Sequence, residues 1–228
     1  MRRLGVLAAV LLGTVLLTSC AANLEKAKQE LLAQEDTRPP VAVAVLFDNS
    51  ASYRDWVEPT LSEVRLLFQC LAARHPEAGV SLVLVASEPQ NIFSGKAARL
   101  QTAYDDLARI LRHGRSPYTD LSMAVNHASY FLEKADPQRK VMIIFSDLKH
   151  STPSYYPRDA RTVPPPEDFP WDRVDDVDVF AVYAPFAEWR LWNEQVEARG
   201  LQATFQALLP EEMKATHVAD AVLPRTGD

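Results

Sequence analysis

The chain has 228 residues, of which 47% are hydrophobic and 24% are charged, so it is long enough to bury a sizeable core. Its formal net charge is -6, and the charges form neither a basic stripe nor a long run of one sign. This balance argues against nucleic acid as a partner, because nucleic-acid binding relies on a basic surface.

The first residues have the layout of a secretory signal. A basic start at residues 1–3 is followed by an apolar run over residues 4–17, which is shorter than the ~20 residues of a comfortable membrane span. The run ends in Leu-Thr-Ser-Cys, which resembles the bacterial lipobox. The resemblance implies a signal peptide over residues 1–19 and a lipid on Cys20 that attaches the chain to a membrane. The alternatives are a plain signal peptide and a single-pass anchor with an incidental cysteine.

Residues 20–40 are expected to form a tether between the lipid and a folded domain. They contain few large apolar side chains and end in two prolines. Alanine rather than aspartate follows Cys20, which resembles outer-membrane lipoproteins in Gram-negative sorting. We therefore expect the chain in the bacterial cell envelope, on the outer membrane facing the periplasm if the cell is Gram-negative.

A domain over residues 41–228 begins with an apolar run. Residues 41–47 show no polar alternation, a pattern typical of a strand that is buried on both faces of a parallel sheet. Further strands are expected at 80–86, 141–145, 177–183 and 203–208, with a short edge strand near 91–93.

Helical patterns separate these strands. Apolar residues recur at intervals of three and four over 57–71, 100–111, 121–132 and 189–196. The alternation predicts an α/β fold, a doubly wound and mostly parallel sheet with helices on both faces. Residues 150–173 interrupt it with six prolines, so we expect a long loop there in place of most of a helix.

Polar side chains follow two of the predicted strands, and another opens a helix. Asp48, Ser50 and Ser52 come after the first strand, Asp147 comes after the strand at 141–145, and Thr119 precedes the third helix. Ligands of parallel sheets bind beyond the carboxyl ends of the strands, so these side chains are expected at one edge. Such an all-oxygen set suits a hard cation such as Mg²⁺ (or Mn²⁺). Because hydroxyls carry no charge, the cation is left able to accept a carboxylate from a partner.

The order D-x-S-x-S, then T-D-L, then S-D resembles the metal-ion-dependent adhesion site of von Willebrand factor A (vWA) domains. The resemblance covers the chain from about residue 41 to its end. It implies that the cation is held, directly or through water, by five residues: Asp48, Ser50, Ser52, Thr119 and Asp147. It also implies an open coordination position that takes a glutamate or aspartate from a protein partner.

The chain departs from the family's pattern in two loops. The family commonly has glycine after the third-loop aspartate, where this chain has Leu148, and leucine resists conformations that glycine permits. Lys149 follows, and its charge would either weaken cation binding or help to hold an acidic partner. Pro117 and Tyr118 stand where a glycine usually precedes the second-loop threonine.

Several of these residues also have a simpler interpretation. Thr119 by itself is typical of a helix N-cap, and Asp147 of a cap at a strand end. His150 is expected to be a solvated loop histidine rather than a ligand. A candidate partner surface comprises Tyr118, Lys149, Tyr155, Tyr156, Phe169 and Trp171, since aromatic residues are enriched at binding hot spots. The alternative is that the aromatic residues of the insert pin it to the domain.

The sequence therefore favours a binding module rather than an enzyme: an envelope-anchored domain that recognises an acidic group on a protein partner through a divalent cation. One alternative is a metal-dependent phosphohydrolase, which would need D-x-D where this chain has Ser50. Neither a nucleophile elbow nor a phosphate-cradling glycine loop is present. The other alternative is a metal-free scaffold, for which Leu148 and Lys149 are the best support.

Overall fold

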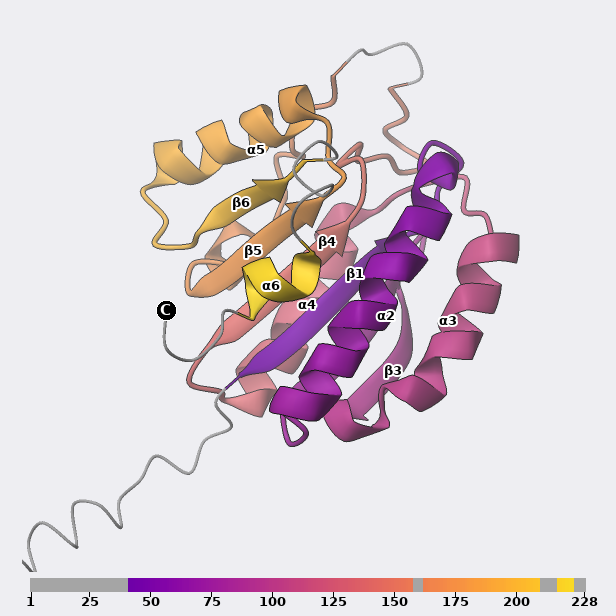
Figure 1. Cartoon of the computed structure of the whole chain (residues 1–228). Coiled ribbons are helices and arrows are strands. Elements are labelled where there is room, and N and C mark those ends of the chain that lie inside the picture. The colour runs from indigo at the N-terminus through magenta and orange to yellow at the C-terminus, as the bar shows by residue number, and fades with distance from the viewer. Residues whose placement is uncertain (1–40, 158–161, 210–216, 224–228) are drawn as a thin grey trace, which may run out of the picture. The chain divides into compact units, whose positions relative to one another are not determined.

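The computed structural model describes residues 41–157, 162–209 and 217–223 (Figure 1). The predicted signal peptide, Cys20 and the tether lie outside the described residues. Within the described ranges, no helix combines the length and the apolar character needed to cross a membrane.

The described residues form a six-stranded sheet in the order β3-β2-β1-β4-β5-β6. All neighbouring strands are parallel except β2 and β3, which are antiparallel. The prediction of a doubly wound, mostly parallel α/β sheet is confirmed. The strand bounds are β1 (Ala42–Asp48), β2 (Gly79–Val85), β3 (Gln90–Lys96), β4 (Lys140–Phe145), β5 (Val177–Val182) and β6 (Phe205–Leu208).

Helices cover both faces of the sheet (Figure 1). One face carries α2 (Val57–Arg74), α3 (Gln101–His113) and α6 (Val218–Val222), and the other carries α4 (Leu121–Ala135) and α5 (Phe186–Arg199). The four longer helices contain the predicted apolar stripes, and α3 ends beside Gly114 as expected. The sequence pattern does not predict α6, because five residues are too few to display a helical stripe.

The central strand β1 is buried along its whole length, which explains its unbroken apolar sequence. Successive side chains of a strand point to opposite faces. Val43, Val45 and Phe47 accordingly join the core beneath α2 and α3. Ala42, Ala44 and Leu46 join the core beneath α4 and α5. A polar residue within this strand would be buried on either face, so the first polar side chain appears only at its carboxyl end.

The direction of chain progression reverses between β1 and β4. From β1 the chain proceeds outward to β2 and β3, and it then returns to β4 and proceeds outward to β5 and β6. Phe47 pairs with Phe145 in the parallel register, so Asp48 and Ser146 leave the sheet at the same level. Loops that leave such a reversal point in opposite directions open a crevice, which is where doubly wound proteins bind ligands.

The described parts of the proline-rich insert form a loop, as predicted, that contains only the short 3₁₀ helix η3 (Trp171–Arg173). Phe169 and Trp171 are buried, and the ring of Phe169 meets Trp192 of α5 edge-on at 4.8 Å between centroids. Of the two interpretations of Phe169 and Trp171, burial supports the one in which their rings pin the insert to the domain, and not their place in the candidate partner surface. Tyr155 and Tyr156 are 43% and 49% exposed, and their place in the candidate partner surface stays a prediction.

Candidate metal centre

Asp48 lies at the bottom of the candidate site, at the end of β1, and is only 1% exposed. One carboxylate oxygen, Oδ1, accepts a hydrogen bond from the backbone N–H of Ser50 at 2.8 Å. The other, Oδ2, accepts one from the hydroxyl of Ser146 at 2.7 Å. Because each bond comes from a different loop, Asp48 is held in one orientation and joins the loop after β1 to the loop after β4.

The environment of Asp48 disfavours the charged carboxylate when no cation is bound. Burial and the nearby charge of Asp147 raise the pKa of Asp48 to about 7, although hydrogen bonds from Ser146 and Ser50 act in the opposite direction. Such a carboxyl holds a proton where an exposed aspartate has none. A divalent cation can take the place of that proton, since it neutralises both carboxylates together.

This raised pKa makes the stability of the metal-free protein depend on pH. The folded state binds a proton that the unfolded state releases near pH 4, so the free energy of unfolding falls as the pH rises from about 4 to about 7. The contribution is on the order of 4 kcal/mol. Urea denaturation in EDTA at several pH values should show this loss in the wild type and not in Asp48→Asn. Parallel pH profiles for the two proteins would contradict the argument.

The hydroxyl groups above Asp48 come from two loops that are joined by backbone hydrogen bonds. The hydroxyls of Ser50 and Ser52 lie 3.0 Å apart. Thr119 is buried, and it exchanges backbone hydrogen bonds of 3.0 and 2.9 Å with Ser151. The N–H of Ser116 donates to the carbonyl of Asn49 at 2.8 Å and ties the second loop to the first.

The loop after β4 supplies Asp147, which is buried beside Asp48. Its Oδ1 accepts a hydrogen bond from the N–H of Lys149 at 3.1 Å, while the N–H of Leu148 donates to Ser146 at 3.0 Å. These bonds close a tight turn that keeps Asp147 at the site.

The donors gathered here fit a hard cation. The nearby groups are carboxylates and hydroxyls, which are the ligands that Mg²⁺ prefers. In the described ranges, no three His, Cys, Asp or Glu side chains gather so that they could hold a metal ion. A cation at this edge would therefore have to take hydroxyl oxygens, which Ser50, Ser52 and Thr119 offer where they line one pocket.

Thr119 is not the N-cap of the helix that follows it, which was the simpler interpretation of this residue. Asp120 is the N-cap of α4, and its Oδ1 accepts a hydrogen bond from the N–H of Met123 at 2.9 Å. Thr119 lies one position earlier, outside the helix. Its hydroxyl is therefore not needed to cap α4.

Comparisons with solved structures identify the architecture. The chain is similar to a von Willebrand factor type A structure from Catenulispora acidiphila at 13% identity and a TM-score of 0.52, covering 77% of this chain and 40% of that one. It is also similar to the PilB minor pilin from Streptococcus sanguinis at 11% identity and a TM-score of 0.51, covering 78% and 59% respectively.

A third structure, an aerotolerance-related membrane protein from Bacteroides fragilis, has 10% identity and a TM-score of 0.50, and the match covers 80% of this chain and 96% of that one. No family model and no curated protein matches the sequence. This chain has the von Willebrand factor type A fold. It spans less than two thirds of the length of the pilin and of the Catenulispora structure.

The turn after β4 contains Leu148 at the position where vWA domains commonly have glycine, and its backbone is strained there. Leu148 has φ of +60°, in the left-handed region that glycine adopts without strain and leucine does not. Its side chain is completely buried in the core beneath α4. The turn keeps its geometry because burial of the leucine side chain offsets the backbone strain.

Replacing Leu148 by glycine is expected to lower the stability of the protein. The substitution removes about 1–2 kcal/mol of backbone strain, but deleting a buried leucine side chain costs about 2–5 kcal/mol. We expect a net loss of about 1–3 kcal/mol, measured by denaturant unfolding. A more stable Leu148→Gly protein would show that strain, rather than burial, dominates this turn.

His150 is buried in the vWA domain and is not the solvated histidine that the sequence analysis expected. It is 4% exposed, and its Nδ1 accepts a hydrogen bond from the N–H of Leu121 at 3.3 Å. Burial lowers the pKa of His150 despite the nearby charges of Asp120 and Asp168. The ring thus satisfies a backbone donor at the start of α4, which the sequence could not reveal because residues 121 and 150 are far apart in the chain.

Glu188 is a further buried group near the site that the sequence analysis did not identify. It lies in the first turn of α5, with its carboxylate 4.0 Å from the ammonium group of Lys149. Burial raises the pKa of Glu188, and the charge of Lys149 lowers it. Nothing in the sequence distinguishes Glu188 from the solvated glutamates of the same helix.

Proposed function

We propose that this chain is an envelope-anchored vWA module that binds a protein partner by accepting the partner's carboxylate at a divalent cation, Mg²⁺ or Mn²⁺. The observation that carries the proposal is the meeting of three loops, which bring Asp48, Ser50, Ser52, Thr119 and Asp147 to one edge of the sheet. Anchoring through a lipid on Cys20 belongs to the same proposal and rests on the sequence motif.

Binding rather than turnover is proposed because the carboxylate of Asp48 is not presented as a nucleophile. Both oxygens of Asp48 already accept hydrogen bonds, and the carboxylate is buried. An attacking aspartate would need an exposed oxygen within reach of the substrate. The same constraint suits a residue that holds a cation, directly or through water, without reacting.

Isothermal titration calorimetry of the purified full chain with Mg²⁺ and Mn²⁺ tests the cation. We expect saturable binding at one site, accompanied by proton release near pH 7 as Asp48 ionises. Absence of any heat with either ion would favour the metal-free scaffold.

Partner recognition needs a separate measurement. We expect the chain to capture its partner from envelope extracts in Mg²⁺ and to release it in EDTA. Capture that survives EDTA would remove the cation from the mechanism.

A further inference from the structure

The pocket above the candidate cation site is larger than a single carboxylate requires. Its volume is about 340 Å³, in the range of sites that enclose whole small ligands. The hydroxyl groups of Ser50, Ser52 and Thr119 lie on one part of its wall. A carboxylate bound to a cation there would leave most of the volume unfilled.

The pocket lining also contains apolar and aromatic residues: Pro117, Tyr118, Tyr156, Pro157 and Val163. The rings of Tyr118 and Tyr156 meet edge-on at 5.7 Å, and the carbonyl of Tyr118 accepts a hydrogen bond from Ser116 at 2.6 Å. Prolines and a fixed aromatic pair form a rigid surface, which loses little conformational entropy when an apolar side chain packs on it.

Lys149 and His150 also line the pocket. The Lys149 ammonium group lies 4.0 Å from the buried carboxylate of Glu188, and its side chain is 38% exposed, so it can also attract an acidic occupant. An extended peptide offers both a side-chain carboxylate and backbone carbonyls as acceptors for an ammonium group.

We infer that the pocket binds an extended peptide segment of the partner in which an acidic residue stands next to a large apolar residue. The carboxylate lies at the hydroxyl end of the pocket, and the apolar side chain packs on Tyr118 and Tyr156. This inference rests on the proposed function and adds to it the class of sequence that the site selects.

The test uses blocked tetrapeptides as probes, with the full chain in Mg²⁺. The first pair of peptides contains glutamate and phenylalanine, in either order, between two glycines. In the second pair glycine replaces the phenylalanine, and in the third pair glutamine replaces the glutamate. Binding is followed by chemical-shift changes in NMR titrations. We expect the better glutamate–phenylalanine peptide to bind about tenfold more tightly than its glycine counterpart, because contact with an aromatic hot spot is worth about that factor.

Two tyrosine variants provide the matched comparison. Tyr156→Ala should abolish the tenfold advantage of phenylalanine and leave the binding of the glutamate–glycine peptide unchanged. Tyr130→Ala changes an exposed tyrosine of α4 that does not line the pocket and should have no effect.

The outcomes separate this inference from the function on which it rests. Equal affinity for the phenylalanine and glycine peptides, with Mg²⁺-dependent binding of both, would overturn the inference alone. Binding of the glutamate peptides that is unaffected by EDTA would overturn the inference together with the cation-bridged mechanism. No binding of any peptide, by a chain that still binds Mg²⁺ in calorimetry, would overturn the inference alone. Tight binding of the glutamine–phenylalanine peptide would overturn the requirement for an acidic residue.

Discussion

Asp48→Asn is expected to weaken Mg²⁺ binding by at least about a hundredfold, because it removes one of two negative charges beneath the cation. The structure favours asparagine as the replacement. Its amide oxygen can still accept the hydrogen bond from the N–H of Ser50, and its amide group can donate to the hydroxyl of Ser146. The loops should therefore stay in place, and the loss should be confined to the cation. Calorimetric titration measures it directly.

Asp105→Asn is the matched control for this variant. Asp105 is an exposed aspartate of α3, so its replacement changes the net charge by the same amount without touching the site. Its Mg²⁺ affinity should remain within about twofold of the wild type, since exposed charges at a distance are screened. Retention of full Mg²⁺ affinity by Asp48→Asn would place the cation elsewhere and remove the basis of the proposed function.

Trp192→Ala is expected to lower the free energy of unfolding by about 3–5 kcal/mol, a large fraction of the total stability of a domain. Trp192 is buried on α5, and its ring contacts Phe169 and Trp171 of the insert and stacks on Phe205 of β6. Its removal leaves a cavity at the point where the insert is attached to the domain. Denaturant unfolding measures the effect.

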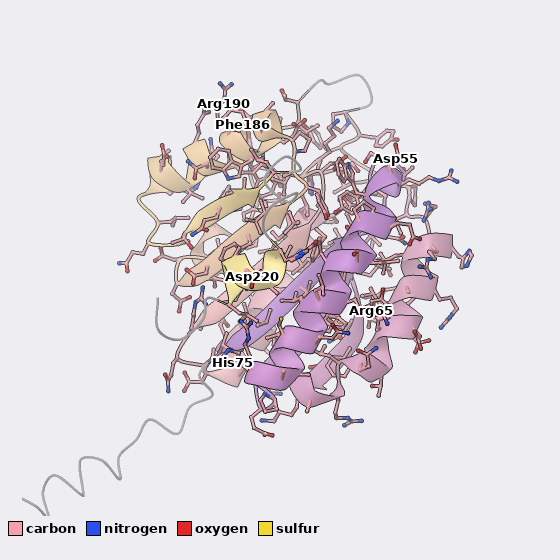
Figure 2. The ribbon with its side chains drawn as sticks, in the orientation of Figure 1. Asp55, Arg65, His75, Phe186, Arg190 and Asp220 are labelled. Atoms are coloured by element: carbon pink, nitrogen blue, oxygen red, sulfur yellow. The ribbon has the colours of Figure 1, made fainter. Side chains whose placement is uncertain are left out.

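Phe186→Ala provides the comparison on the same helix. Phe186 is 57% exposed and lies, with Arg190, on the side of α5 that faces away from the sheet (Figure 2). We expect a change of less than about 1 kcal/mol, because an exposed ring buries little area. Equal losses for the two variants would show that the aromatic cluster does not anchor the insert.

The position of the candidate site follows from the sheet rather than from any one loop. β1 and β4 are neighbours with a parallel register, so the residues that follow them emerge side by side although about a hundred positions separate them. Ser146 bonds to Asp48 across this junction. Because the chain turns away to opposite sides after these strands, the space above the junction stays open to a ligand.

Patterns over adjacent residues were sufficient to predict most of the fold. The unbroken apolar run of β1 indicated burial on two faces, and the helical stripes indicated which face of each helix packs inward. These patterns are local because strand and helix periods are properties of short segments. The edge strand β3 extends beyond its predicted residues, since it is half exposed and carries little apolar signal.

Such local patterns do not predict contacts between segments that are far apart in the chain. His150 was predicted to be solvated, two interpretations of Phe169 and Trp171 stayed open, and Glu188 was not identified, although the structure buries all four. His150 and Phe169 contact residues far away in the chain, Leu121 and Trp192 respectively. A polar or aromatic residue in a loop looks the same in the sequence whether a distant helix covers it or not.

The sequence by itself determined the order of the elements, the doubly wound sheet and the candidate ligand residues, because each depends on local periodicity and on residue type at a strand end. Only the tertiary structure decided three features: the left-handed turn at Leu148, the hydrogen bonds that fix the orientation of Asp48, and the apolar residues that line the pocket. Those features arise where three loops meet, and the free energy that maintains them comes from burial and hydrogen bonds between segments that are not neighbours in the chain.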